Sequence, residues 1–299
     1  MIFKKVLREV RSVVDADNII LYFPDVKAKD HRVNLHVSDM RMNGIIGTDE
    51  VGRSPYNLGD FLGNVIVNWM LAKKGLSLDD YVLQKQHLLT VGSGAVKSYQ
   101  NMTMWGAGVE RELPQMVRRF FQKSWFRKLD IRAVRGPMSR DYLIRLGHKC
   151  PEVYGDPAIL MPLIYAGQGE KKYDFSIIPQ LVTEKGVREK YPDAHIISMN
   201  TDDYKGVIDQ IVQSRLIVSS SLHGVILADV YGVPSVWYRG LGKEIDFKYK
   251  DYYASTGRYV EWIPTCVEEA LQCNPLPLPD LKLLQEGLLS TFPYDLWDK

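Results

Sequence analysis

The sequence predicts a mixed α/β fold with parallel sheets, organised in two halves, and three observations support this prediction. Strand-like runs alternate with helix-like runs from about residue 60 to about residue 270, which is typical of parallel sheets joined by helices. The chain has 299 residues, of which 45% are hydrophobic and 25% charged, so it can bury a large core in two domains. A polar segment with two glycines at 166–172 separates the halves, so we expect one domain at 1–165 and another at 166–299.

The composition argues against several other classes of protein. The 38 basic and 36 acidic residues give a net charge of +2, whereas dedicated nucleic-acid binders usually carry a clear basic excess. No stretch approaches the ~18 apolar residues that span a bilayer, and the first residues lack the apolar core of a secretory signal. We therefore expect a cytoplasmic protein. Because no C-x-x-C pair occurs, packed thiols are expected rather than disulfides at Cys150, Cys266 and Cys273.

In the first half, short strands precede glycine-containing loops or helices. The predicted strands, which are short and rich in apolar residues, lie at 33–39, 87–91, 101–104 and 131–134. The predicted helices, whose apolar residues recur on one face, lie at 61–74 and 138–146. Pro137 fits the first turn of the second helix, where its missing N–H costs nothing. Residues 1–50 are expected to form an N-terminal extension.

The second half repeats the alternation of strands and helices. The predicted strands lie at 175–178, 195–198, 216–219 and 234–237. The predicted helices lie at 182–190, 204–213, 222–231 and, near the C-terminus, 281–289. Asp202 and Asp203 are expected at the N-cap of one of these helices. Two such halves bring the carboxyl ends of their strands to a shared cleft, where open α/β sheets bind ligands.

The segment at 215–237 carries the densest group of candidate functional residues. An apolar strand ends in three serines at 219–221, and a helix is expected to begin near Leu222. The free N–H groups and the dipole of that helix point into the serine loop, where hydroxyl groups can bind an anion or cap the helix. His223 is expected in the first turn, either as a functional group beside that site or as a packed bystander.

Two further junctions carry charged residues. Asp60 directly precedes a predicted helix, either as its N-cap or as a carboxylate that acts as a general base or binds a hydroxyl group. Gly59 would allow the backbone to approach a ligand closely. Arg135 follows a strand, with Ser139 in the first turn of the next helix, and could bind a carboxylate or phosphate or pair on the surface with Asp141 or a nearby acid. The sequence contains neither G-x-G-x-x-G nor H-E-x-x-H, so dinucleotide and catalytic metal sites have no support.

Several motifs occur together in an order that is known from one family. The most specific is S-S-L-H-G at 220–224, which is followed by A-D-V-Y-G-V-P at 228–234. The others are N-L-G-D at 57–60, G-S-G at 92–94, W-G-A-G at 105–108, V-R-G-P-M-S at 134–139 and G-D-P-A at 155–158. Over about residues 52–255 the chain resembles the polysaccharide pyruvyltransferase family.

This resemblance implies a fold, a reaction and partners. The fold would consist of two Rossmann-like domains facing a cleft, similar to GT-B glycosyltransferases. Members transfer the pyruvyl group of phosphoenolpyruvate to two sugar hydroxyls, which forms a ketal on a polysaccharide or its lipid-linked repeat unit. The expected partners are phosphoenolpyruvate, as donor substrate, and a glycan acceptor, with no tightly bound cofactor, metal or nucleic acid. We expect a bacterial cytoplasmic enzyme that contacts the inner face of the membrane through its acceptor.

The resemblance also implies that Asp60, Arg135 and His223 are catalytic. We assign His223 to the general acid or to a phosphate contact, because imidazole ordinarily titrates near neutral pH. Asp60 is expected to act as the base or to anchor the acceptor hydroxyl, and Arg135 to hold the donor anion. The further residues expected to bind substrate are Asn57, Gly59, Ser93, Ser139, Ser219, Ser220, Ser221, Leu222, Gly224 and Lys248.

The chain departs from the family pattern at two positions. Many relatives have an arginine where this chain has Ser221, and a histidine where it has Gln180. We expect Arg140, Lys243 or Lys248 to supply the positive charge that the donor anion needs.

Two other functions stay open on the sequence. A metal-independent glycosyltransferase of the same architecture would bind a nucleotide sugar, with Glu244 or Asp246 on the ribose. A non-catalytic glycan-binding relative would keep the fold without the reaction, in keeping with Ser221. The predicted loop at 246–253 interleaves charged and aromatic residues, so it would stack on sugar rings or pack as an aromatic edge.

Overall fold

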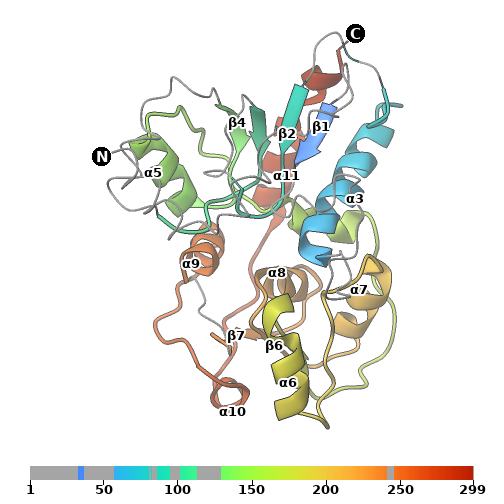
Figure 1. Ribbon diagram of the computed structural model, residues 1–299, viewed down its shortest axis with the longest axis vertical. Coiled ribbons are helices and arrows are strands. Elements are labelled where there is room, and N and C mark those ends of the chain that lie inside the picture. Colours follow the sequence, from blue (N-terminus) through green and yellow to red (C-terminus); the bar gives the residue numbers. More distant parts are fainter. Residues whose placement is uncertain are drawn as a thin grey trace, which may run out of the picture.

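The computed structural model shows a mixed α/β protein with two separate parallel sheets (Figure 1). It describes residues 33–36, 57–80, 82, 86–94, 102–112, 129–240 and 246–298. The strand order is β1-β2-β3-β4 in the first sheet and β5-β6-β7 in the second. The predicted fold class, α/β with parallel sheets, is therefore confirmed. The finer arrangement, two Rossmann-like domains around a cleft, stays a prediction.

In the described part of the chain, the first sheet contains four parallel strands in chain order. Its strands are β1 (Val33–His36), β2 (Gln86–Leu89), β3 (Met102–Trp105) and β4 (Leu129–Ala133). The pairing of β1 with β2 confirms the expectation that the segment near residue 33 joins this sheet, whereas most of the extension at 1–50 lies outside the described residues. The helices of this part are α3 (Leu58–Ala72) and α5 (Pro137–Arg145), and Pro137 occupies the first turn as predicted.

The second sheet has three parallel strands, with β6 in the centre. Its strands are β5 (Ser176–Ile178), β6 (Ile217–Ser219) and β7 (Ser235–Trp237). The described helices that follow β5 in the chain are α6 (Glu184–Lys190), α7 (Tyr204–Val212), α8 (Leu222–Val230), α9 (Asp246–Ser255), α10 (Val267–Ala270) and α11 (Lys282–Thr291). Short 3-10 helices lie at Pro157–Leu163, Leu181–Thr183 and Tyr294–Trp297. As expected, Asp203 caps α7, where its carboxylate accepts from the N–H of Gly206.

The predicted strand at 195–198 is wrong. The segment makes one bridge, between Ile196 and Ile177, in which the N–H of Ile177 donates to the carbonyl of His195 and the N–H of Ile197 donates to the carbonyl of Ile177. The pairing with β5 stops there, because the hydrogen bonds of the following residue involve side chains. Ser198, for example, donates to Glu184 and accepts from the N–H of Asn200. The local polar side chains therefore compete with the strand for its backbone hydrogen bonds.

The predicted loop at 246–253 is also wrong, because this segment forms α9. Tyr249, Tyr252 and Tyr253 are buried, and their spacing of three and four residues places them on one side of a helix. The ring of Trp237 stacks on Tyr249 at a centroid distance of 4.3 Å. The interleaved charges and aromatics thus belong to a helix, and these tyrosines pack into the core.

The C-terminal segment packs against the first sheet, and Figure 1 shows α11 (red) next to it. The indole Nε1 of Trp105 donates to the carbonyl of Leu288 over 3.0 Å, and the Trp105 ring meets Phe292 edge-on at 4.9 Å. Trp297 donates to the carbonyl of Ser77 over 3.0 Å. The chain therefore builds the second sheet and then returns to the first. The domain boundary at 165/166 stays a prediction.

The two sheets are also joined through one continuous apolar core. This core includes Leu62 of α3, Ile159 of the 3-10 helix, Ile217 of β6 and Ile226 of α8. Helix α8 is buried along nearly its whole length, which fits a helix that is apolar all round. Among the described residues, no helix has the length and apolar character that a membrane span needs.

Candidate functional site

The serine loop between β6 and α8 is held by hydrogen bonds between its hydroxyl groups and nearby backbone groups. Ser219 Oγ donates toward the carbonyls of Ile178 and Ser221 and accepts from the N–H of Ser221. Ser220 Oγ accepts from the N–H of Gln180 over 3.1 Å. Ser221 is the N-cap residue of α8, yet its hydroxyl caps no N–H. Anion binding by the three serines stays a prediction, and Ser221 has the hydroxyl that is least committed to the loop.

His223 lies in the first turn of α8 and is packed between two other elements. Only 9% of the residue is exposed. On one side, a Cβ atom on Gly59 of α3 would lie 1.9 Å from the Nδ1 atom of His223. On the other side, Nε2 lies 3.7 Å from Oδ2 of Asp156. Gly59 therefore makes room for the imidazole of His223. A close approach of its backbone to a ligand stays a prediction.

Asp156 is a candidate site residue that the sequence did not single out. It is fully buried and precedes the 3-10 helix at Pro157–Leu163, where its Oδ1 accepts from the N–H of Ala158 over 3.0 Å. Its other oxygen faces His223. Within the described part of the chain, neither Asp156 Oδ2 nor His223 Nε2 has a hydrogen-bond partner, although both atoms are buried. The available signal was the motif G-D-P-A, which contains this residue.

Asp156 and Arg135 extend from the same end of the first sheet. Val134, directly after β4, accepts from the N–H of Gly155 and donates to the carbonyl of Val153, each over 3.0 Å. The two charged residues follow this paired stretch. The structure thus places His223 against two residues, Gly59 and Asp156. Gly59 is the neighbour of Asp60 in the sequence. Asp156 lies near the end of β4, where Arg135 follows the strand.

Asp60 is not the N-cap of α3. The helix begins three residues earlier than expected, and Asn57 is its N-cap residue. Asn57 Nδ2 donates to Oδ2 of Asp60 over 3.0 Å, and Asp60 is 3% exposed. The start of α3 is fixed because the N–H of Leu58 donates to the carbonyl of Met199 over 2.8 Å. The carboxylate of Asp60 thus lies in the first turn, where the helix dipole favours negative charge.

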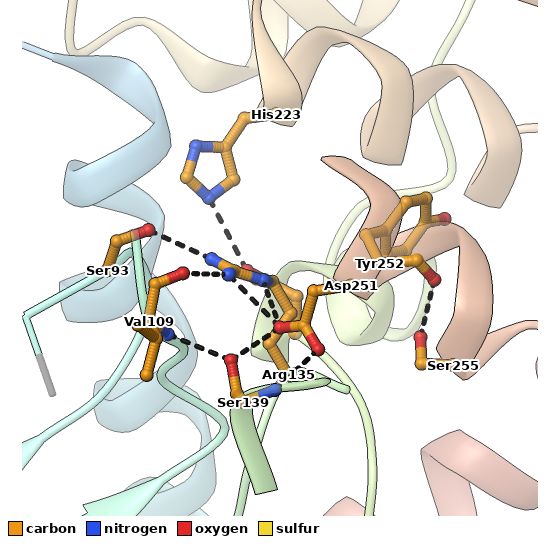
Figure 2. Close-up of polar contacts among 9 residues, drawn as sticks. Ser93, Val109, Arg135, Ser139, His223, Asp251, Tyr252 and Ser255 are labelled. Carbon is orange, nitrogen blue, oxygen red and sulfur yellow. Dashed lines mark hydrogen bonds and ion pairs between the residues drawn. The ribbon is translucent and has the colours of Figure 1, made fainter. Parts of the chain in front are cut away.

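Arg135 is fully buried and lies in a polar cluster shown in Figure 2. Its Nε donates to Asp251 Oδ2 over 3.1 Å, its Nη1 to Ser93 Oγ over 2.9 Å, and its Nη2 to the carbonyl of Val109 over 2.6 Å. The alternative of a surface pair with Asp141 is wrong. Asp251, on α9, neutralises the guanidinium charge. Binding of the donor anion by Arg135 stays a prediction, and it would require a change of partner.

Ser139 completes this cluster from α5. Its N–H donates to Asp251 Oδ1 over 2.9 Å, its hydroxyl donates to Asp251 Oδ2 over 2.5 Å, and it accepts from the N–H of Val109 over 2.9 Å. Gly108 leaves room for Arg135, because a Cβ there would lie 2.4 Å from the guanidinium carbon. The cluster therefore ties α9 to α5. Asp251 was missed because its segment was predicted to be a loop.

The other cations expected to assist are placed differently. Arg140 donates to the carbonyl of Cys150 and pairs with Glu152 at 3.0 Å. The ammonium group of Lys248 lies 5.2 Å from the ring centroid of Tyr249. Lys243 lies outside the described residues. Roles for these cations in donor binding stay predictions.

Asp246, considered for a ribose, and Gln180, at the position of the family's missing histidine, have local partners. Asp246 pairs with Arg239, whose guanidinium lowers the pKa of that carboxyl, and Glu244 lies outside the described residues. Gln180 Nε2 donates to the hydroxyl of Tyr249 over 3.1 Å. Gly224 allows close packing, because a Cβ there would lie 2.4 Å from Ser219 Oγ.

A sequence model of the family "Polysaccharide pyruvyl transferase" matches residues 75–240, which is more than half of the chain. The chain belongs to this family. The match includes Arg135, Asp156 and His223 and begins after Asp60. The resemblance inferred from the motifs is therefore confirmed.

Two curated relatives and one solved structure add to this comparison. The succinoglycan biosynthesis protein ExoV of Rhizobium meliloti is 32% identical over 63% of this chain and 54% of its own length. An uncharacterised protein of Acanthamoeba polyphaga mimivirus is 30% identical over 57% of this chain and 60% of its own length. The chain thus spans less than two thirds of either relative. A functionally uncharacterised Klebsiella pneumoniae protein is 11% identical, with a TM-score of 0.47 over 79% of this chain and 92% of that protein, which is too low to carry an argument.

Proposed function

We propose that this protein transfers the pyruvyl group of phosphoenolpyruvate to two hydroxyl groups of a polysaccharide or its lipid-linked repeat unit, forming a ketal. Family membership supports this proposal, and a relative carries the name of a succinoglycan biosynthesis protein. The observation that carries it is the position of His223 at the start of a buried helix, between Gly59 and Asp156. The proposal includes two Rossmann-like domains around a cleft and a cytoplasmic location.

The start of α8 is suited to the anionic groups of the donor. The first main-chain bond of the helix runs from the N–H of Val225 to the carbonyl of Ser221. The N–H groups of Leu222, His223 and Gly224 precede that bond, so they have no partner within the helix. Such groups, together with the helix dipole, favour phosphate or carboxylate. The hydroxyl of Ser221 would add a donor at the position where many relatives have arginine.

Ketal formation needs one proton delivered and two protons removed. Protonation of the donor's methylene carbon gives an oxocarbenium-like centre at the neighbouring carbon, and each sugar hydroxyl forms a bond to that centre and loses its proton. The bond to phosphate breaks, and the phosphate leaves as hydrogen phosphate, which carries away one of the two hydroxyl protons, while the other replaces the proton used on the methylene carbon. We assign the proton donor to His223 and the proton acceptor to Asp60, which follows Gly59 directly in the first turn of α3.

The test is a reaction of the purified protein with phosphoenolpyruvate and a panel of galactosides and other glycan acceptors. We expect release of inorganic phosphate and, by mass spectrometry, an acceptor that has gained a pyruvyl group. Thermal-shift measurements should show stabilisation by phosphoenolpyruvate, because a ligand that binds the folded state raises its stability. Stabilisation by nucleotide sugars alone, with transfer of a sugar, would instead establish a glycosyltransferase. Binding of the glycan without any phosphate release would establish a non-catalytic relative.

A further inference from the structure

We infer that Asp156 is a positioning residue that holds the Nε2–H of His223 and leaves Nδ1 as the nitrogen that exchanges a proton with the substrate. The catalytic part of this inference rests on the function proposed above. The orientation of the imidazole can be tested by itself. The contact is the dashed line that leaves the ring of His223 in Figure 2.

The first argument is that two buried polar atoms face each other without another partner. Asp156 is 0% exposed and His223 is 9% exposed, and their facing atoms make no hydrogen bond in the described part of the chain. A buried carboxylate oxygen without a donor is strongly unfavourable. A proton on Nε2 gives that oxygen a donor, whereas a bare Nε2 would place two acceptors against each other.

The second argument is that the carboxylate is fixed and the ring can adjust. Oδ1 of Asp156 is held by the N–H of Ala158, and the preceding Gly155 is bonded to Val134 beside β4. The distance of 3.7 Å between Nε2 and Oδ2 exceeds a hydrogen bond. Contacts of this kind in ligand-free sites are often long and shorten when substrate binds. A small rotation of the imidazole would close the gap.

The third argument concerns the nitrogen that remains. Because Nε2 is buried, the small exposed part of His223 does not include it. Nδ1 lies on the side of Gly59, in the first turn of α3, which also carries Asp60. With Nε2 bound to Asp156, the proton that reaches the donor must come from Nδ1. The proposed acid, Nδ1 of His223, and the proposed base, Asp60, would then both act at the first turn of α3.

The test is Asp156→Asn. Asparagine keeps the oxygen that accepts from Ala158, but it can turn an NH₂ group toward His223. We expect the neutral imidazole to carry its proton on Nε2 in the wild type and on Nδ1 in the variant. Nitrogen-15 NMR of histidine-labelled protein at about pH 8.5, where imidazole is ordinarily neutral, distinguishes these tautomers. The chain has six histidines, and His223→Gln identifies the signals of His223 by their loss.

Turnover supplies the second readout. A wrong tautomer in a catalytic triad lowers kcat by up to about 10⁴-fold, so we expect Asp156→Asn to lower kcat by at least about 10²-fold with little change in KM for phosphoenolpyruvate. The matched control is Asp203→Asn, another aspartate that accepts from a helix N–H, far along the chain at α7. It should change neither the NMR signals of His223 nor kcat.

The two proposals can fail separately. A wild-type His223 with its proton on Nδ1 would overturn the inference, and this measurement does not require that the variant folds. Unchanged ring signals or unchanged kcat in a folded Asp156→Asn protein would also overturn it. If the tautomer changes as expected but the wild type consumes no phosphoenolpyruvate, the orienting contact stands and the proposed function falls.

Discussion

Replacement of Gly59 by alanine would test the geometry of the site without removing any functional group. Gly59 lies inside α3, where alanine is ordinarily the more favourable residue by up to about 1 kcal/mol. The added methyl group would, however, lie 1.9 Å from Nδ1 and 2.6 Å from Cγ of His223. Helix formation and the site therefore respond in opposite directions to this single methyl group.

The size of the displacement follows from the contact distances. Ordinary van der Waals contact begins at 3.4 Å, whereas the new Cβ atom would lie 1.9 Å from Nδ1 of His223. The imidazole would therefore have to move away by about 1.5 Å. The helix cannot easily move instead, because the N–H of Leu58 is bonded to the carbonyl of Met199 and the adjoining side chains are buried. A misplacement of about 1 Å can cost about 10²-fold in rate. We expect Gly59→Ala to lower turnover by at least that factor.

The assay is phosphate release from phosphoenolpyruvate with a glycan acceptor, together with thermal unfolding of the same samples. We expect a large loss of turnover and a melting temperature within a few degrees of the wild type. Gly287→Ala is the matched control, since Gly287 lies inside α11 and a Cβ there would lie 3.3 Å from the nearest atom, a methyl of Val153. Wild-type turnover in a folded Gly59→Ala protein would refute the placement of His223 in the reaction.

Four other outcomes are expected. His223→Gln should lower phosphate release by about 10²- to 10⁴-fold and leave the circular dichroism spectrum unchanged, because a positioned acid or base contributes that factor. Asp251→Asn should lower the free energy of unfolding by about 3–5 kcal/mol in a denaturant titration, because it leaves Arg135 buried without its counter-ion. Asp295→Asn, at an exposed ion pair, should cost at most about 1 kcal/mol. Burial raises the pKa of the Cys150 thiol to about 12, so alkylation at pH 8, followed by mass spectrometry, should be much slower in the native than in the unfolded chain; equal rates would contradict this.

The sequence was most informative where one local pattern determined the structure. The apolar run before the serines predicted β6 and the start of α8, because a buried strand and the following buried helix both need continuous apolar residues. At 246–253 the same approach failed. The segment was interpreted as a loop that would either stack on sugar rings or pack as an aromatic edge, and the structure bears out the packing but not the loop. The sequence could not decide between the two, because the burial of the three tyrosines depends on Trp237 and other distant residues.

The partners of the site residues were harder to predict for the same reason. Arg135 and Asp251 are 116 positions apart, and no spacing rule links them. The contact between Asp156 and His223 likewise joins the end of the first sheet to the start of α8. The sequence predicted which residues carry suitable chemistry, but the pairing of charges across the fold depends on tertiary packing.

The return of α11 to the first sheet has a consequence for how the protein matures on the ribosome. Domains commonly fold in the order of their synthesis, as soon as each has emerged. Here the indole N–H of Trp105 donates to the carbonyl of Leu288, and Phe292 packs against the same ring. Both partners lie more than 180 residues later in the chain. The first sheet is synthesised before the second, but its packing against α11 cannot form until the residues of α11 have been translated. We therefore expect fragments that stop before α11 to expose this apolar face and to depend on chaperones.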